Sequence, residues 1–165
     1  MEVEKAIRER RSVRTYRSQE VKEETVRRIL DAGRWAPSGL NNQPWKFLVL
    51  EKACKDSLAE YTKYGEVIRS SARVILVFLD REESYHYEKD LLAVGACVQN
   101  MLLEIHSCRL GGCWLGEILN RREAVHAKLE IPGHLQLEAV IAVGVPGGGT
   151  QAGVRKELGA LWIGK

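Results

Sequence analysis

Hydrophobic and polar positions recur along the chain with two different spacings, which predict helices and strands. Apolar residues three or four positions apart predict helices at residues 2–9, 22–36 and 91–108. Short apolar runs rich in β-branched and aromatic residues predict strands at residues 45–50 and 73–80. Ordered elements therefore flank the most polar loop of the chain, residues 36–47, on both sides.

That loop reads APSGLNNQPWKF and is dense in amide and hydroxyl groups. Pro37 restrains the residue before it and Pro44 removes a backbone donor, so the chain between them is forced open. Asn41, Asn42 and Gln43 each carry a donor and an acceptor. Such a set suits the edge of a flat heterocycle, for example the pyrimidine ring of a flavin. The alternative is that these side chains only satisfy the backbone of a turn.

A second polar cluster follows the first predicted helix, at residues 10–14. If this segment is extended, Arg10, Ser12 and Arg14 face one side, and Arg11 and Val13 face the other. Guanidinium groups match phosphate oxygens in shape and charge, so the cluster predicts a site for a phosphate monoester. The alternatives are a solvated basic run or a patch that binds nucleic acid.

Composition narrows the class of protein. A chain of 165 residues with 45% apolar content is expected to form one domain with a core. The net charge of +3 is mild and dispersed, so it gives little support to a nucleic-acid partner. No apolar run reaches membrane-spanning length and no apolar signal region opens the chain. We therefore expect a soluble, cytoplasmic protein with no membrane and no nucleic acid among its partners.

Other chemistries find little support in the sequence. The four cysteines lack CxxC spacing and are expected to be mostly buried free thiols, although Cys108 and Cys113 are close enough along the chain to pair. The histidines show no metal-ligand spacing, so no metal site is predicted. There is no GxGxxG after a strand, and Gly147–Gly149 lacks the lysine of a P-loop.

Three motifs together resemble one family. RRSVRTY at residues 10–16, DAGRWAPSGLNNQPWKF at 31–47 and RLGGCWLG at 109–116 resemble, in this order, the FMN-dependent nitroreductase family. The resemblance covers nearly the whole chain. It implies an α+β fold with three α/β/α layers around a mixed, mainly antiparallel sheet, and a homodimer that shares two FMN sites at its interface. It also implies that residues 147–165 form a domain-swapped arm that reaches the partner subunit, with 147–150 as a flexible crossing; the alternative is a frayed terminal linker.

The resemblance assigns FMN-binding roles to several groups of residues. The first motif would hold the phosphate, with Arg14 near N1 and the C2 carbonyl of the flavin; the second would pack on the FMN of the partner subunit; the third would place backbone amides near N5. A basic pair before the terminal segment would reach the phosphate, although in isolation it would be ordinary surface charge. The residues are Arg10, Arg11, Ser12, Arg14, Pro37, Ser38, Gly39, Asn41, Gln43, Leu115, Gly116, Arg155 and Lys156.

The chain also departs from the family pattern. Many members carry a second serine where Gly39 stands, and many carry proline where Arg73 stands. In relatives, a polar residue just before the position of residue 72 often contacts the flavin, and this sequence does not show which residue would make that contact. Its candidates are Lys63, Arg69, Ser70 and Ser71.

The resemblance implies an NAD(P)H oxidoreductase. NADH or NADPH would pass a hydride to N5 of FMN, and a nitroaromatic, quinone or similar flat acceptor would then use the same site, so no catalytic side chain is expected. The short connection at residues 81–88 predicts an open, unselective site. The alternatives are a flavin-binding redox sensor without turnover, or a family member that fragments flavin or removes halogen.

Overall fold

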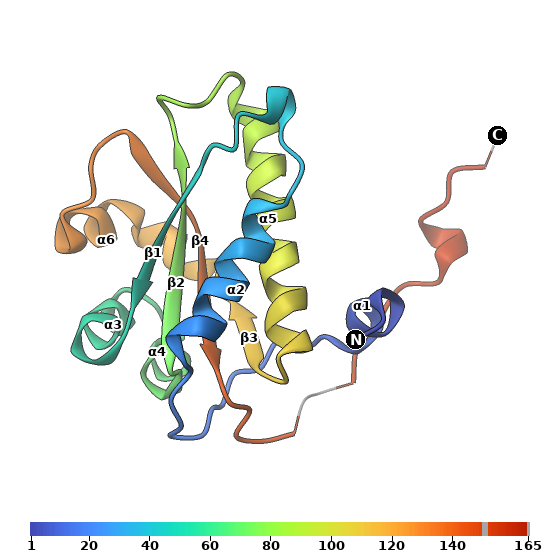
Figure 1. The fold of residues 1–165 in the computed structure, drawn as a ribbon, viewed down its shortest axis with the longest axis horizontal. Coiled ribbons are helices and arrows are strands. Elements are labelled where there is room, and N and C mark those ends of the chain that lie inside the picture. Colours follow the sequence, from blue (N-terminus) through green and yellow to red (C-terminus); the bar gives the residue numbers. More distant parts are fainter. Residues whose placement is uncertain (150–151, 165) are drawn as a thin grey trace.

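A four-stranded antiparallel sheet forms the centre of the protein, as a computed structural model describes it for residues 1–149 and 152–164 (Figure 1). The strands lie in the order β1-β2-β4-β3, and each named strand pairs antiparallel with its neighbours. In register, Phe47 lies opposite Val77 and Ile75 opposite Ile141. The strand bounds are β1 Trp45–Leu50, β2 Arg73–Asp80, β3 Gly111–Trp114 and β4 Leu135–Gly144.

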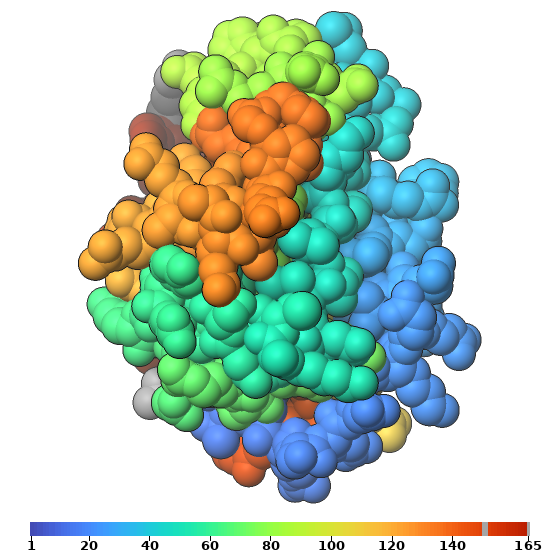
Figure 2. Space-filling model, turned by 90° about the vertical axis from the view of Figure 1, so that its left-hand side faces the viewer, coloured from blue at the N-terminus to red at the C-terminus, as the bar shows by residue number. Residues whose placement is uncertain are grey.

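Helices cover both faces of this sheet, which gives three layers (Figure 1). On one face lie α2 and the long α5; on the other lie α3, α4 and α6, and Figure 2 shows this second face. The helix bounds are α1 Val3–Glu9, α2 Glu23–Arg34, α3 Lys52–Leu58, α4 Gly65–Ser70, α5 Tyr87–Ser107 and α6 Arg122–Leu129. Short 3₁₀ turns are η1 Gly39–Asn41, η2 Ala59–Tyr61, η3 Glu117–Arg121 and η4 Leu158–Ala160.

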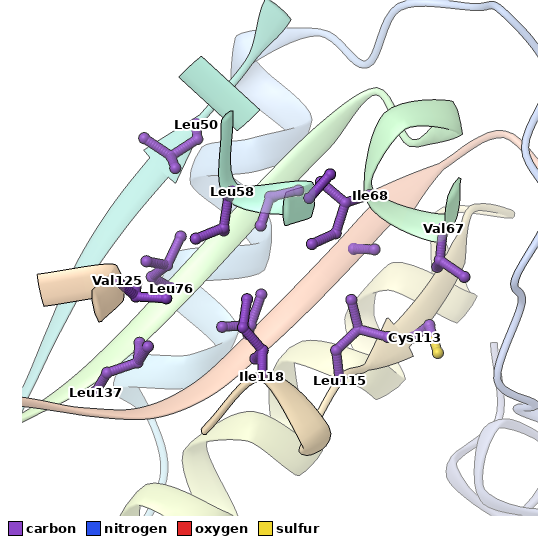
Figure 3. Packing of buried hydrophobic residues seen from close by; sticks show 14 of the residues in the cluster. Leu50, Leu58, Val67, Ile68, Leu76, Cys113, Leu115, Ile118, Val125 and Leu137 are labelled. Carbon is purple, nitrogen blue, oxygen red and sulfur yellow. The ribbon is translucent and has the colours of Figure 1, made fainter. Parts of the chain in front are cut away.

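The central strand β2 supplies both halves of the core, because successive side chains of a strand point to opposite faces. Leu76 packs with Leu58 and Ile68 beneath α3 and α4 (Figure 3). Val77, the next residue, packs with Ile29 and the inner side of α5. A strand buried on both faces explains why residues 73–80 read as a continuous apolar run.

The two ends of the chain extend away from this body (Figure 1). Helix α1 exposes Val3 and Ile7, and every residue of 152–164 is exposed. Within that terminal segment, Trp162 is 70% and Ile163 is 91% exposed. Large apolar side chains with no cover favour a docking role for this segment. Residues 150, 151 and 165 of the predicted arm, including Thr150 of its crossing, lie outside the described residues.

The predicted fold class is confirmed. All three predicted helices and both predicted strands form, and the strand bounds agree with the sequence. In the described part of the chain, the parallel part of the expected mixed sheet is one isolated bridge between Ser12 and Gly112. All four cysteines are free; Cys97 and Cys113 are buried as expected, but Cys54 is exposed because it lies on the solvent side of α3. Among the described residues, no helix is both long and apolar enough to cross a bilayer.

Candidate functional site

A cationic pocket lies between the segment after α1 and the start of the terminal segment. Its volume is about 410 Å³. One wall is the run Arg10–Thr15, as the sequence pattern indicated. The other wall is formed by Gly148, Gly149, Ala152, Gly153, Val154 and Arg155. We call this site the arginine pocket.

The charges of the arginine pocket are not balanced by carboxylates. Within the described residues, no ion pair involves Arg10, Arg11, Arg14 or Arg155. Burial of the Arg10 guanidinium, and then repulsion from Arg11 and Arg155, lowers the pKa of Arg10. Positive charges that lie this close together repel one another, and a bound anion relieves the repulsion. Planar guanidinium donors also fit phosphate oxygens. The donor set of the pocket therefore suits the phosphate of FMN.

Strand β3 fixes the position of the arginine run. The Val13 N–H donates to the Gly112 carbonyl at 3.0 Å, and the Val13 side chain is buried. A Cβ atom at Gly111 would lie 2.7 Å from the Val13 side chain, so only glycine allows this approach. The buried Tyr16 hydroxyl donates to the Val13 carbonyl at 2.7 Å. A backbone bond to β3 and a side-chain bond from Tyr16 thus hold the run along the sheet.

The chain that leaves β3 offers free backbone donors. The Leu115 N–H is already bonded to the Val140 carbonyl at 2.8 Å, whereas the Gly116 N–H has no acceptor among the described residues. Of the two amides predicted to face a flavin, Gly116 is therefore the available one. The carboxylate of Glu117 accepts from the Thr62 hydroxyl at 2.6 Å and from the Lys63 N–H at 3.1 Å. The bond from Thr62 is the main reason why the pKa of Glu117 is lowered.

The second predicted cluster, which we call the amide loop, comprises residues 38–43. Leu40, Asn41 and Gln43 all adopt left-handed backbone angles, with φ of 55°, 54° and 48°. Such angles are uncommon outside glycine and tend to mark functional segments. The Ser38 hydroxyl accepts from the Gln43 N–H at 3.0 Å, and the Asn42 amide bridges the Glu83 carbonyl and the Asp90 carboxylate. The loop is therefore held in one strained shape.

The departure at Gly39 has a structural reason. A Cβ atom there would lie 2.1 Å from the Tyr85 hydroxyl and 2.6 Å from the ring. Tyr85 comes from the connection between β2 and α5 and lies on the amide loop. A serine at this position would displace the Tyr85 ring. The glycine therefore allows the ring to lie on the amide loop.

A single chain does not bring the two predicted clusters together. The amide loop, with Pro37 before it, lies at one end of the sheet beside the start of α5, and the arginine pocket lies at the other end (Figure 1). Arg155 lines the pocket, while Lys156 is exposed and is not among the residues that line it. Leu115 is buried beneath the sheet. A site built from both predicted clusters would therefore need residues from both ends of the sheet.

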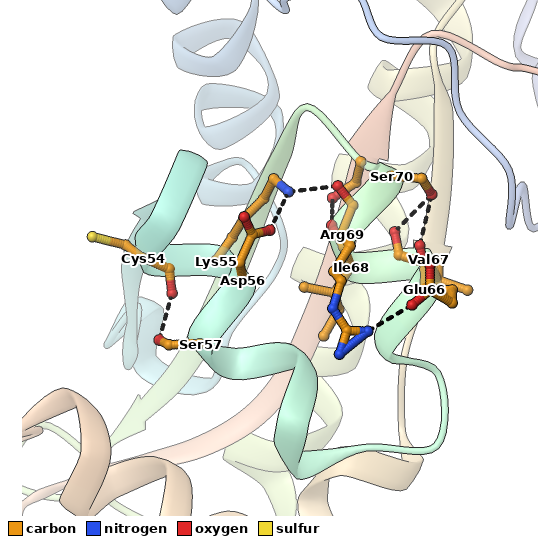
Figure 4. A network of polar contacts seen from close by, with 10 residues as sticks. Cys54, Lys55, Asp56, Ser57, Glu66, Val67, Ile68, Arg69 and Ser70 are labelled. Carbon is orange, nitrogen blue, oxygen red and sulfur yellow. Dashed lines mark hydrogen bonds and ion pairs between the residues drawn. The ribbon is translucent and has the colours of Figure 1, made fainter.

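Most candidates for the unassigned contact are used within the chain. Arg69 pairs with Glu66 at 2.6 Å, and the Ser70 hydroxyl donates to the Glu66 carbonyl (Figure 4). The Ser71 hydroxyl donates to the Ile68 carbonyl. Lys63 differs, because its ammonium group lies 5.4 Å above the Tyr64 ring and forms no ion pair among the described residues.

Two carboxylates that link segments of the fold were not predicted from the sequence. Asp90 and Glu117 each tie two segments together, as the bonds above show. An acidic residue near a helix start is usually read as a solvated group favoured by the helix dipole, so neither position stood out.

A separate polar group, Asp80, Glu82 and His134, brings its ligand atoms within 4.8 Å of one another. Lys46 already lies 3.4 Å from the Asp80 carboxylate, and we assign no metal there.

Comparisons with known proteins agree with the fold and with the family resemblance. The model of the nitroreductase family matches residues 7–71 and 54–145. A crystal structure from Desulfovibrio desulfuricans, titled as a nitroreductase in complex with FMN, is 46% identical, with a TM-score of 0.96 over 100% of this chain and 97% of that one. Two curated relatives are provisionally named NADH dehydrogenase/NAD(P)H nitroreductase. The Methanothermobacter thermautotrophicus relative is 32% identical over 88% of this chain and 78% of its own length; the Archaeoglobus fulgidus relative is 30% identical over 86% and 84%.

Proposed function

Because this chain belongs to the nitroreductase family, we propose that it is an FMN-dependent NAD(P)H oxidoreductase acting on nitroaromatics, quinones or similar flat acceptors. The observation that carries the proposal is the arginine pocket, where several guanidinium groups gather and, in the part of the chain that the structure describes, form no ion pair with a carboxylate. The FMN complex of the 46% identical relative supports the identity of the anion. The names of the curated relatives support NADH or NADPH as the electron donor.

In this proposal the arginine pocket holds the FMN phosphate. Arg10 and Arg11 line its inner side, and Arg155 closes it from the terminal segment. The Ser12 hydroxyl adds a neutral donor on the same wall. Arg14, which also lines the pocket, carries a cation toward the ring and stabilises negative charge that develops there.

We further propose that the amide loop belongs to the site of a partner subunit in a homodimer. Its position at the far end of the sheet leaves no route to the pocket of its own chain (Figure 1). Asn41 and Gln43 are exposed on the loop and offer donors and acceptors to the pyrimidine edge of a flavin. The exposed apolar residues of the terminal segment provide the surface that a dimer would bury.

Bound FMN would supply hydride acceptance at N5 and delivery of electrons to the second substrate. The protein's part is positioning and electrostatics. The free Gly116 N–H provides a donor beside β3, and Glu117 holds residues 62–63 next to it. The short connection between β2 and α5 supplies little cover, so flat acceptors of several kinds would enter.

The first test is an absorption spectrum of the protein purified without added cofactor, repeated without oxygen after NADH and NADPH in turn. We expect a flavin band that one nucleotide bleaches, followed by reoxidation with a quinone or a nitroaromatic. A colourless protein that takes up no added FMN would overturn the proposal. A flavin band that neither nucleotide bleaches would indicate a flavin-binding protein without turnover. Product analysis would reveal flavin breakdown or dehalogenation.

A further inference from the structure

Asp90 is a fully buried carboxylate at the start of α5, with 0% of its surface exposed. One of its oxygens, Oδ2, accepts from the Ser84 hydroxyl at 2.7 Å and from the N–H groups of Tyr85 and His86 at 3.0 and 3.1 Å. The other, Oδ1, accepts from Asn42 Nδ2 at 3.0 Å. Four donors from two separate segments therefore converge on one carboxylate.

The carboxylate stays charged at neutral pH. Burial alone would raise the pKa of Asp90, but the bonds from Ser84, His86, Asn42 and Tyr85 outweigh it and lower the pKa. Within the described residues no lysine, arginine or histidine pairs with Asp90. A buried charge that is neutralised only by hydrogen bonds depends on each of them, so losing one donor is costly.

Asn42 is the link from this charge to the amide loop. Its Nδ2 group donates both to the Asp90 carboxylate and to the Glu83 carbonyl, at 3.0 and 3.1 Å. The side-chain oxygen of Asn42 is buried and has no hydrogen-bond partner among the described residues. Turning the amide over would set oxygen against oxygen at both contacts. The orientation of Asn42 is thus fixed through its nitrogen alone.

The residues on either side of Asn42 need such a restraint. Asn41 and Gln43 hold left-handed backbone angles, which persist only where the surroundings impose them. Three of the four bonds to Asp90 serve the connection before α5, and they would explain the carboxylate as a helix-start residue only. The fourth bond comes from the loop, which lies outside that connection. Removing this bond alone would therefore distinguish a role in positioning the amide loop from a role at the start of α5.

We propose that Asp90 is a positioning residue of the flavin site: through Asn42 it holds the amide loop in the shape that presents Asn41 and Gln43 to the cofactor. This inference rests on the proposed function. It adds a residue that does not touch the cofactor and that no motif of the chain indicated.

The test compares wild type with Asn42→Ala and Asp90→Asn. Asn42→Ala removes the link, together with the bond to the Glu83 carbonyl, and leaves the three bonds from Ser84, Tyr85 and His86 to Asp90 in place. In Asp90→Asn, the oxygen can keep those three donors, but its amide then faces the Asn42 amide with donor against donor. We expect each variant to bind FMN about tenfold more weakly, as for one lost charged hydrogen bond, and to change the visible flavin spectrum in the same way. The double variant should add little, because both changes break one link.

Glu138→Gln is the matched control. Glu138 is also a carboxylate that is mostly shielded from solvent, with 10% of its side chain exposed, but it pairs with Arg122 between β4 and α6, away from the amide loop. This control should change the melting temperature without changing FMN affinity or spectrum. If Asn42→Ala binds FMN like wild type with an unchanged spectrum, the role of Asp90 is overturned while the proposed function stands. If wild type itself binds no FMN, the proposed function fails and this role fails with it.

Discussion

Arg10 is the residue whose charge most needs an outside partner. Its guanidinium is partly buried among other cations, and no carboxylate pairs with it among the described residues. We predict that Arg10→Ala weakens FMN binding by about 1.5–3 kcal/mol, which is roughly a ten- to hundredfold rise in Kd. Titration of the apoprotein with FMN, followed by flavin fluorescence, measures this change.

Arg27→Ala provides the control, because Arg27 forms an exposed ion pair with Glu23 on α2. Removing such a pair should change stability by less than about 1 kcal/mol and leave FMN affinity unchanged. Equal FMN affinity in Arg10→Ala and wild type would mean that the phosphate lies elsewhere.

At the residue scale, the sequence indicated site residues that stand out by type, but it did not show which residues contact one another in the fold. The arginines of the pocket stood out because guanidinium groups match phosphate oxygens in shape and charge. Asp90 and Tyr85 did not stand out, because their significance lies in contacts across the fold with Asn42 and Gly39. No pattern along the chain records such contacts.

Among the elements, β3 was the hardest to foresee. It is four residues long and begins with two glycines, a composition typical of turns. The turn after α5 is instead made by Arg109, with φ of 60°. Strands β1 and β2 were predictable since their apolar runs fill the core, whereas β3 exists because β4 offers it a partner.

The arginine run bonds to strand β3, so a substitution at Gly111 of this strand should affect the arginine pocket. A methyl group there would lie 2.7 Å from Val13 and push the run off the sheet. We expect Gly111→Ala to lower both stability, by about 1–3 kcal/mol, and FMN affinity. Thermal melting and FMN titration measure the two effects. Gly95→Ala on α5, where the new methyl group meets no neighbouring side chain within 4 Å, is the matched control: it should leave FMN affinity unchanged and raise stability by about 0.5–1 kcal/mol, as alanine does inside a helix.

Helix α6 contributes a pH-dependent contact. His126 Nε2 accepts from the Leu137 N–H at 3.2 Å, which requires a neutral ring. Burial, and then the nearby Arg122, lowers the pKa of His126 below the ordinary 6.5. As pH falls below 6.5, the unfolded chain binds a proton that the folded chain excludes, so stability is lost; above 6.5 the contribution is complete.

Melting temperatures at pH 7.5 and 5.5 test this. We expect wild type to lose more than His126→Gln between the two values, at about 2–4 °C for each 1 kcal/mol. Glu138, which faces Arg122 and whose pKa burial raises, titrates in both proteins and cancels in the comparison. Parallel losses in the two proteins would show that His126 is not the titrating group.

For the whole molecule, residue spacing predicted single helices and strands, and the family resemblance implied how they are layered. Each amphipathic face must be covered, but spacing alone does not say which element covers it. Nothing in the spacing placed the amide loop and the arginine pocket at opposite ends of the sheet; the family resemblance alone implied that two chains share each site. Distance across a fold is set by topology, which short motifs do not encode.

The terminal segment leads to a prediction for the assembly. A variant ending at Gly147 lacks Arg155 and the exposed apolar residues that follow it. We expect wild type to sediment as a dimer and the truncated protein as a monomer that no longer retains FMN. A truncated protein that remains fully dimeric would refute a role for this segment in assembly.

The separation of pocket and loop also has a genetic consequence. If each site takes its pocket from one chain and its loop from the other, an allele that ruins the pocket and an allele that ruins the loop are both null alone. Expressed together, they form mixed dimers in which one site collects both defects and the other collects none. Two inactive alleles would then restore activity to each other, and two pocket alleles would not.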